Sequence, residues 1–578
     1  MTKVNTISFT PAVGWGLRDN MRMKNSYFKG GTTPPLIEET IGTCFQRTAS
    51  RFPDRDALIV RHQGIHWAWA EYDEQVERLA AGLLALGLGP GDRVGLWAPN
   101  CYEWCLTQFA TARIGAVLVC INPAYRVFEL EYALNKSGCR AIVAAEQFKS
   151  SRYLEMLQKL APELDSCAPG RLVAEKLPHL EIVIRMGEES TPGMFNFPAV
   201  LDKGGEDERE RIGQIGSELS PFDVINIQFT SGTTGNPKGA ALTHHNILNN
   251  ANQVAAGMRF SEQDRLCIPV PMYHCFGMVL GKLACVTRGA AAVFPGDAFE
   301  PGAVLESVEA ERCTALHGVP TMFIAELEYP DFARYDLSSL RTGIMAGAPC
   351  PVEVMKKVIS RMNMAEVLIA YGQTECSPVN HMTLADDPIE KRVESVGRAG
   401  PHLEVKIVDE DDRIVPVGER GDICTRGYAV MKGYWDDPER TAETVDAEGW
   451  LHSGDLGVMD EEGYVQVVGR LKDMIIRGGE NIYPREIEEF LFTHPKIQDA
   501  KVVGVADEKY GEEVCVWVMP REGAVLSEDE VRTFCKEHIA YFKVPRYIRF
   551  VEEFPMTVTG KVQKFRMREQ MEEELGLA

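Results

Sequence analysis

Long apolar runs are absent from this 578-residue sequence. A membrane-spanning helix needs about 20 consecutive apolar residues, and no stretch approaches that length. The first residues, MTKVNTISFTPAVGWGLRDN, also lack the apolar segment behind a basic end that marks a secretory signal. We therefore expect a soluble, cytoplasmic protein with no integral membrane segment.

Clustered cysteines are absent as well. The 15 cysteines are scattered singly, and only Cys101 and Cys105 lie close together, with no histidine or further cysteine beside them. This spacing disfavours a disulfide framework and a zinc site. Buried free thiols are the expected state of these side chains.

Positive charge is in short supply. The chain has 61 Lys and Arg against 84 Asp and Glu, a formal net charge of -23, and it has no basic stripe. An acidic surface repels nucleic acid and anionic membranes, so we expect neither as a partner. An anionic substrate would have to be bound by local cations, glycine-loop amides or a metal ion.

The pattern that is present is mostly α/β. Residues 71–100 and 110–146 both alternate helix and apolar strand, which predicts a parallel sheet covered by helices. From about residue 400, short strands with tight turns suit an antiparallel or barrel-like piece. Past Lys472 the segments predict a compact α+β unit. The charged stretch 201–220 reads as the linker with the weakest tendency to order.

The most informative segment is FTSGTTGNPKGA, residues 229–240, with three glycines, four hydroxyl residues and one lysine. The apolar residues 224–229 before it predict a buried strand, and residues 244–258 after it predict a helix. Glycines let backbone N–H groups turn inward, hydroxyls add donors, and a lysine supplies charge for an anion. We therefore predict a phosphate-binding loop.

This loop differs from a Walker A loop. The Walker pattern needs a glycine directly before the lysine and a hydroxyl directly after it, whereas Lys238 lies between Pro237 and Gly239. The missing hydroxyl removes the usual magnesium ligand. Any magnesium must then be held by a residue from elsewhere in the chain.

Four later motifs complete the pattern. They are AYGQTE (370–375), WLHSGDLG (450–457), GRLKDMIIRGGENIYPREIE (469–488) and FPMTVTGKVQKFRMRE (554–569). Taken singly, each has an ordinary interpretation: an aspartate in a glycine turn commonly bonds its own backbone, and a lysine near the chain end is commonly a solvated charge. Their occurrence together and in this order is what carries information.

In that order, these motifs closely resemble the adenylate-forming superfamily of acyl-CoA synthetases, nonribosomal adenylation domains and firefly-type luciferases, from about residue 40 to about residue 570. PMYHCFGM (271–278), WLHSGDLG and GGENIYPREIE look most like fatty acyl-CoA ligases of medium-chain type. The resemblance implies two half-reactions. A carboxylate and MgATP give acyl-AMP and pyrophosphate, and coenzyme A then displaces AMP to give the thioester.

The resemblance also implies a fold and a division into domains. The fold class is α/β, with a large N-terminal domain of layered α/β subdomains plus a β-barrel-like piece, and a small mobile α+β C-terminal domain. The expected boundary gives an N-terminal adenylation domain at 1–471 and a C-terminal domain at 472–578. Lys472 matches the family's hinge.

The site residues are those that match the family's motifs. Glu375 would hold Mg²⁺, Thr374 would contact phosphate, Tyr371 would stack on adenine, and Asp455 would accept bonds from the ribose hydroxyls. Arg470 would contact the same ribose. The expected ATP-binding set is Thr230, Ser231, Gly232, Thr233, Thr234, Gly235, Lys238, Gly347, Ala348, Tyr371, Gly372, Gln373, Asp455 and Arg470.

The strongest expectation concerns Lys561. It follows a proline-to-glycine turn that in the family carries a cation to the carboxylate and the α-phosphate, so we expect Lys561, Thr374, Glu375 and His274 to be the catalytic set. His274 would be a gate between the acyl and nucleotide pockets, with a packed core histidine as the alternative. The expected acyl-pocket rim is His274, Cys275, Phe276 and Met278, and Gly478 and Gly479 would leave room for the pantetheine arm of coenzyme A.

Rival functions remain within the superfamily. A luciferase-like oxygenase would share the adenylation half, and a nonribosomal module would carry a neighbouring carrier domain, for which the chain after the last motif has no room. A binding protein without activity would be expected to have lost Lys238, Glu375, Asp455 or Lys561. Medium-length fatty acids are the first expectation for the substrate, with short branched, aryl or sulfur-containing acids as alternatives. We expect a monomer or a homodimer with small-molecule substrates only.

Overall fold

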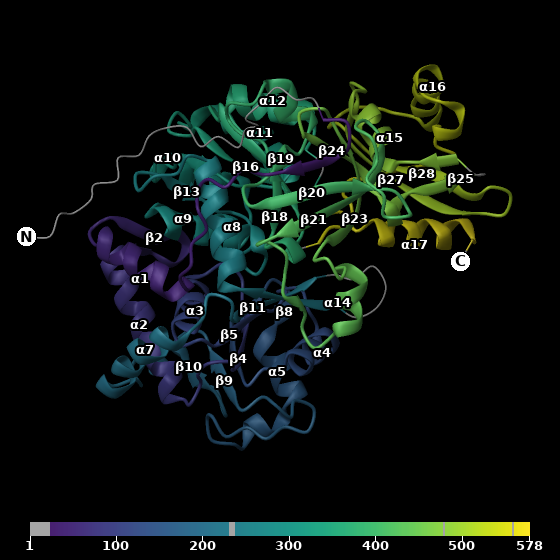
Figure 1. The fold of residues 1–578 in the computed structure, drawn as a ribbon. Helices are drawn as coiled ribbons and strands as arrows, with labels where there is room; N and C mark the ends of the chain where they lie inside the picture. The colour runs from purple at the N-terminus through teal and green to yellow at the C-terminus, as the bar shows by residue number, and fades with distance from the viewer. Residues whose placement is uncertain (1–22, 231–236, 349, 478–479, 558–559, 578) are drawn as a thin grey trace, which may run out of the picture.

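The computed structural model describes residues 23–230, 237–348, 350–477, 480–557 and 560–577. Three large sheets with surrounding helices form the chain up to about residue 470, and a fourth sheet forms the C-terminal part (Figure 1). Within the described ranges, no helix is long and apolar enough to cross a membrane. The α/β class predicted from the sequence is confirmed.

The first sheet has eight strands. Its central strands are short apolar runs such as VLVC and AIVA, which suit strands buried on both faces, and they pair in parallel. At one edge the chain turns back on itself, so that the last pairings are antiparallel. In order across the sheet the strands are β10 (Phe195–Asn196), β9 (Ile182–Arg185), β6 (Ala141–Ala144), β4 (Arg93–Trp97), β5 (Val117–Cys120), β11 (Val224–Thr230), β12 (Lys238–Thr243) and β22 (Gly433–Tyr434).

The second sheet has nine strands, with a parallel centre and antiparallel pairs at both edges. In order, they are β19 (Arg398–Ala399), β18 (Val379–Met382), β17 (Glu366–Gly372), β16 (Thr342–Ala346), β15 (Ala315–Leu316), β13 (Arg265–Cys267), β14 (Ala291–Phe294), β2 (Asp56–Val60) and β3 (Ile65–Ala68). The largest hydrophobic core joins residues of both sheets and of the helices between them.

Helix α8 (His244–Gly257) lies between these two sheets, because it contacts β11 and β12 of the first and β18 of the second (Figure 1). All of its residues are buried. Two of its asparagine side chains form hydrogen bonds with neighbouring segments. Asn246 donates to the carbonyls of Tyr428 and Val430, and Asn250 donates to the carbonyl of Val379. This helix thereby fixes two segments that flank predicted site residues.

A second buried helix, α3 (Tyr102–Arg113), is enclosed along its whole length after the first residue. The π-helical segment η3 (Phe276–Leu283) is also fully buried. The other helices of this part are α1 (Ile41–Arg51), α2 (Trp69–Ala85), α4 (Val127–Ser137), α5 (Tyr153–Leu160), α6 (Phe197–Leu201), α7 (Glu206–Glu218), α9 (Ala284–Arg288), α10 (Pro301–Ala310), α11 (Pro320–Leu327), α12 (Val352–Arg361), α13 (Ile389–Glu394) and α14 (Pro438–Thr444).

One sequence expectation is wrong at α7. The charged stretch 201–220 was expected to be the linker with the weakest order, yet most of it is this helix. Glu208 accepts a bond from the backbone N–H of Gly205 at the helix start, and Ile212 and Ile215 are buried against the core. Those two isoleucines are three positions apart, so both lie on one face of the helix, and burial of that face outweighs the polar composition.

The third sheet is antiparallel throughout, as the short strands after residue 400 predict. Its order is β1 (Tyr27–Lys29), β20 (Leu403–Val408), β21 (Arg420–Gly427), β23 (Leu451–Met459) and β24 (Val465–Arg470). Among the described strands the pairing runs in this order from β1 to β24, so the antiparallel expectation is confirmed. The sequence pattern did not reveal that β1, from near the start of the chain, joins this sheet.

The C-terminal part is a sheet with three helices, gathered beside β23 and β24 in Figure 1. Arg485 of its first helix donates to the carbonyl of Val467, and Gln498 donates to Glu328 on the N-terminal part at 3.0 Å. Its elements are β25 (Ile475–Arg477), β26 (Glu480–Ile482), α15 (Pro484–Phe492), β27 (Ile497–Asp507), β28 (Gly511–Pro520), α16 (Glu528–His538), β29 (Tyr547–Phe550) and α17 (Lys564–Leu575).

Candidate active site

The predicted phosphate loop joins two antiparallel strands. Thr230 at the end of β11 pairs with Lys238 at the start of β12, and helix α8 begins only after β12. The expected strand before the loop and the expected helix after it are confirmed. The sequence did not reveal that KGAALT forms a further strand between them, in which four small or apolar residues are buried. The loop residues Ser231, Gly232, Thr233, Thr234 and Gly235 lie outside the described residues.

The ends of this hairpin meet the AYGQTE motif. Glu375, which is 8% exposed, accepts a hydrogen bond from the Tyr434 hydroxyl at 2.8 Å and one from the Thr230 hydroxyl at 3.5 Å. Burial, and next the Glu375 carboxylate, raise the pKa of Tyr434 far above its usual range, so its hydroxyl stays a donor. The Lys238 ammonium lies 4.8 Å from the centre of the Tyr434 ring. A buried carboxylate, two hydroxyls and a lysine thus meet at one point.

Tyr434 was not among the predicted site residues. It lies in MKGYW on the short edge strand β22, which pairs with β12. An aromatic hydroxyl after a glycine is too common a pattern to single out, so only the strand pairing reveals it. The backbone on either side is also fixed, since the N–H of Met431 donates to the Glu375 carbonyl at 2.8 Å.

The short turn Thr374–Cys376 follows directly from β17. Its N–H at Cys376 donates to the Gln373 carbonyl at 2.7 Å, and Thr374 is buried. A Cβ on Gly372 would come 2.0 Å from the Pro378 carbonyl oxygen, so only glycine fits there. The tight packing at Gly372 and the turn set the direction in which Glu375 points.

Asp455, the predicted ribose ligand, is held by two side chains. Its carboxylate accepts from the Tyr371 hydroxyl at 2.7 Å and from Arg470 Nε at 2.8 Å. Asp455 and Arg470 face each other across β23 and β24. The Asp455 charge raises the pKa of Arg470, and burial followed by the same charge raises that of Tyr371. Three residues from three predicted motifs are therefore joined in one network.

The turn before Asp455 is held by Asp422, which the sequence analysis missed. Asp422 Oδ1 accepts from the Gly454 N–H at 2.9 Å, and its Oδ2 lies 3.1 Å from His452 Nδ1. Cys424 lies opposite His452 on the paired strand, with its sulfur 3.4 Å from the same nitrogen. The Asp422 carboxylate raises the pKa of His452. This cluster braces the turn that presents Asp455.

Gly347 and Ala348 follow β16. Gly347 has φ +87°, a conformation that glycine adopts freely and other residues rarely do. The Lys561 Cε lies 3.8 Å from the position that a Cβ on Gly347 would take. The lysine of the C-terminal part thus reaches the wall predicted to lie under adenine.

The turn that carries Lys561 is braced at both ends. The Lys561 N–H donates to Thr557 Oγ1 at 3.0 Å, and the Thr557 N–H donates to the Lys561 carbonyl at 2.7 Å. Burial and then the Arg470 guanidinium lower the pKa of Lys561, against the Asp455 and Glu375 carboxylates, which raise it. The structure therefore brings the predicted catalytic lysine into electrostatic range of three other predicted site residues.

The predicted acyl-pocket rim lies at the start of η3. Cys275 Sγ donates to Gln228 Oε1 at 2.9 Å, and Gln228 Nε2 lies 3.7 Å from Met278 Sδ. Burial, and next the Lys561 ammonium, lower the pKa of His274 to about 3, so its imidazole is neutral. Gln228 was missed as a site residue, although an amide inside the apolar run VINIQF was a visible signal. Phe276 is buried in the same core.

The remaining predicted positions concern the second half-reaction. Lys472 lies in a short turn between β24 and β25, the connection between the two parts of the chain, and it is exposed. Gly478 and Gly479 lie outside the described residues. Their expected role toward coenzyme A and the hinge role of Lys472 stay predictions.

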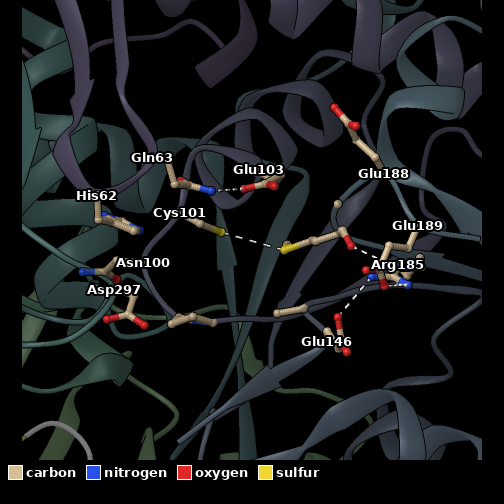
Figure 2. A pocket seen from close by; sticks show the side chains of 14 residues that line it. His62, Gln63, Asn100, Cys101, Glu103, Glu146, Arg185, Glu188, Glu189 and Asp297 are labelled. Carbon is tan, nitrogen blue, oxygen red and sulfur yellow. Dashed lines mark hydrogen bonds and ion pairs between the residues drawn. The ribbon is translucent and has the colours of Figure 1, made fainter.

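A separate hollow of about 420 Å³ lies apart from these residues (Figure 2). Its polar groups largely bond one another: Gln63 donates to Glu103 at 3.0 Å, and Arg185 contacts both Glu146 and Glu189. His62, Glu188 and Asp297 also line the hollow, and none of the predicted site residues does. None of the sequence motifs indicates this hollow.

Comparison with known proteins agrees with this geometry. The family model described as AMP-binding enzyme matches residues 45–435, and the one described as AMP-binding enzyme C-terminal domain matches 486–561. The chain belongs to the AMP-binding enzyme family. The expected boundary at 471/472 falls between the two matched stretches.

Curated relatives cover nearly the whole chain. YngI of Bacillus subtilis, which carries the name of an acyl-CoA synthetase, is 50% identical over 94% of this chain and 99% of its own. The medium-chain acyl-CoA ligase ACSF2 of Rattus norvegicus, a mitochondrial protein, is 46% identical over 96% of this chain and 91% of its own. Within its family the chain is an acyl-CoA synthetase, an AMP-forming ligase.

Solved structures share the fold. The anthranilate CoA ligase AuaEII in complex with anthranoyl-AMP superposes with a TM-score of 0.83 at 25% identity, covering 94% of this chain and 99% of its own. ATP-bound MatB from Rhodopseudomonas palustris gives 0.77 at 28% identity, covering 92% and 99%. ATP binding is a property of this adenylate-forming family.

Proposed function

We propose that this acyl-CoA synthetase activates medium-chain fatty acids with MgATP and transfers the acyl group to coenzyme A. The observation that carries the proposal is the placement of Lys561: a cation from the C-terminal part lies beside Gly347, in range of Asp455 and Glu375. The medium-chain class is supported by the name of the ACSF2 relatives, at 46% identity for the rat protein.

In the first half-reaction a carboxylate oxygen attacks the α-phosphorus of ATP, and pyrophosphate leaves. Negative charge concentrates on the carboxylate and the α-phosphate during this step. An ammonium is a compact charge that can neutralise both, which is the role we assign to Lys561. Lys238 and the hairpin loop would hold the β- and γ-phosphates. Asp455 would accept bonds from the ribose diol once Tyr371 or Arg470 releases one of its oxygens.

Glu375 is suited to hold Mg²⁺. Mg²⁺ prefers oxygen ligands, and here a buried carboxylate lies within hydrogen-bonding distance of the hydroxyls of Thr230 and Tyr434. When bound, the ion would supply charge neutralisation for the phosphates. The residues present therefore fit the ion, and Glu375 replaces the ligand that a Walker A loop would have provided.

In the second half-reaction the coenzyme A thiolate attacks the acyl carbon, and AMP leaves with the bonding electron pair. Lys561 fills the space beside Gly347 in the observed arrangement, so the thiol needs a different placement of the C-terminal part. We propose that the connection at Lys472 is the pivot for that movement. Movements of this kind often limit turnover.

Two measurements test the proposed function. Pyrophosphate release against straight-chain acids of increasing length, with benzoates included, should be fastest for medium chains; a preference for benzoates would contradict the medium-chain assignment. Lys472→Pro should form acyl-AMP in a burst and then stall when coenzyme A is added, because proline fixes φ near −65°. Thioester formation at the wild-type rate by this variant would contradict the pivot.

Cytoplasmic location and a monomeric or homodimeric state are further proposals, which fractionation and sedimentation would test.

A further inference from the structure

Lys282 is a buried cation that the mechanism above does not use. Its side chain lies in the last turn of η3 and is 1% exposed. Nζ donates to the Cys105 carbonyl at 3.3 Å and lies 5.0 Å from the Trp104 ring and 4.7 Å from the Phe109 ring. Among the ion pairs found between described residues, none includes Lys282. Lysine is almost never fully buried unless it is paired, so this placement requires an explanation.

Helix α3, which contacts Lys282, and strand β11 carry buried polar atoms without partners. Trp104 Nε1 and both amide atoms of Gln108 are buried and make no hydrogen bond to any described residue. Trp104 and Gln108 are four residues apart on α3, so they lie on one face of the helix that also supplies the carbonyl bonded by Lys282. Asn226 Oδ1 on β11 is also buried and unpartnered. Buried polar groups are nearly always bonded, so such a concentration indicates a polar ligand.

Contacts connect this group to the predicted acyl pocket. Gln228, which contacts Cys275 and Met278 at the rim, also approaches the Cys120 sulfur at 3.9 Å. The Cys120 sulfur accepts from Asn226, and the Lys282 ammonium acts on the pKa of that thiol. Lys282 follows Cys275 by seven positions. At the rise per residue of an α-helix, this spacing corresponds to a distance along the axis on the order of 10 Å. An acyl chain of medium length bridges such a distance.

The local backbone is unusual at the same place. Residues Phe276–Leu283 form a π-helix, a form that is rare and occurs frequently at functional sites. It begins two positions after His274, and Lys282 is its second-last residue. One continuous segment therefore presents the predicted gate at one end and an unpaired ammonium at the other.

We propose that Lys282, with Trp104 and Gln108, binds a carboxylate at the far end of the acyl substrate, so that the enzyme prefers α,ω-dicarboxylic acids to monocarboxylic acids of equal length. The available donors are Lys282 Nζ, Trp104 Nε1 and Gln108 Nε2, and a carboxylate offers acceptor sites on two oxygens. This inference rests on the proposed function, since it assigns the opposite end of the same acyl site.

The first test needs only the wild-type enzyme. Pyrophosphate release is compared for octanoate and the eight-carbon α,ω-dicarboxylate, and then for the ten-carbon pair. A higher kcat/KM for the dicarboxylate in each pair supports the inference, and a higher value for the monocarboxylate overturns it. Activation of neither acid in either pair would contradict the proposed function itself, so the two failures are distinguishable.

The second test removes the cation. Lys282→Met keeps an unbranched side chain of similar length and should lower the dicarboxylate-to-monocarboxylate ratio of kcat/KM by on the order of a hundredfold, because a buried charge pair is lost. Octanoate turnover should persist and report that the variant is folded. Gln108→Leu should lower the same ratio less. An unchanged ratio in Lys282→Met would overturn the inference.

A matched control is available elsewhere in the chain. Lys406 on β20 is also buried, at 9% exposure, and its Nζ lies 4.7 Å from the Trp450 ring. It belongs to the third sheet and not to the acyl segment. Lys406→Met should leave the acid ratio at the wild-type value; an equal fall in this variant would mean that loss of any buried lysine alters selectivity, and it would overturn the specific role of Lys282.

Discussion

Asp455 and Lys282 are both buried charges in the N-terminal part of the protein, and they are held in opposite ways. Asp455 accepts bonds from Tyr371 and Arg470, and its turn is braced by Asp422. The Lys282 ammonium instead contacts one backbone carbonyl and two aromatic rings. The predicted nucleotide end of the site is thus organised by side chains of the protein itself, whereas Lys282 has no carboxylate partner among the described residues.

Glu326 shows a third way to bury a charged group. It lies on α11, is 1% exposed, and neither carboxyl oxygen has a partner among the described residues. Burial raises its pKa far above the usual range, so this carboxyl keeps its proton. A buried acid can lose its charge in this way at neutral pH. Burial lowers the pKa of Lys282 only to about 8, so that ammonium is still largely charged there.

The largest effect is expected from removing the cation that the C-terminal part brings to the organised end. Lys561→Ala should lower acyl-AMP formation on the order of a thousandfold, because a positioned charge at the reacting phosphate is lost. Rapid-quench separation of acyl-AMP from acyl-CoA measures it. As a control, the variant should still convert supplied acyl-AMP and coenzyme A to the thioester. Equal loss of both half-reactions would contradict a role confined to the first.

The next effect concerns Glu375, whose partners are neutral hydroxyls. Glu375→Gln keeps the shape but removes the charge, and acyl-AMP formation should fall roughly a hundredfold through weaker electrostatic stabilisation. The Mg²⁺ concentration needed for half-maximal activity should rise as well. Activity and Mg²⁺ dependence equal to wild type would exclude Glu375 as the magnesium ligand.

Asp455 gives a more selective effect. Asp455→Asn should weaken ATP binding by roughly ten- to a hundredfold, since hydrogen bonds to a charged group are worth about 1.5–3 kcal/mol. The acid carries no diol, so its binding should change little. Calorimetric titration of each substrate measures both affinities. Arg470→Gln changes the more exposed partner and should weaken ATP binding less. If Asp455→Asn weakened the binding of acid and ATP equally, Asp455 would not be the ribose ligand.

The smallest effect is expected at Glu326 and is one of stability. Its folded-state pKa is raised above the ordinary value of 4.5. Below that pH the carboxyl is protonated in both the folded and the unfolded protein, so it does not change the free energy of unfolding. As the pH rises, the carboxyl ionises in the unfolded protein only. The free energy of unfolding then falls by at most about 1.4 kcal/mol per pH unit. Glu326→Gln removes this loss, so its thermal midpoint should rise above that of wild type from pH 5 to pH 8.

The matched control for Glu326 is Glu394→Gln, at an exposed position of α13. Its midpoint relative to wild type should stay constant across the same pH range. A constant difference for Glu326→Gln would show that the buried carboxyl is ionised in the folded protein.

Much of the site could be predicted from the sequence because its residues lie in short local motifs. Glu375 follows a strand and a glycine, and Asp455 lies in a glycine turn. Both positions depend on local backbone geometry, which neighbouring residues encode. The order of the 201–220 stretch and the additional strand β12 could not be predicted, since each depends on burial against a distant segment.

By itself, the sequence determined the α/β class, the family and the motifs that carry Lys238, Glu375, Asp455 and Lys561. Only the tertiary structure decided which of these residues meet, that Tyr434 and Asp422 support them, and that Lys282 is enclosed without a carboxylate partner among the described residues. The physical reason is that local composition specifies turns and strands, whereas the pairing and burial of a charge depend on segments far apart in the chain, such as η3 and α3. A lysine in an apolar helix has the same appearance in sequence whether it ends in water or in the core.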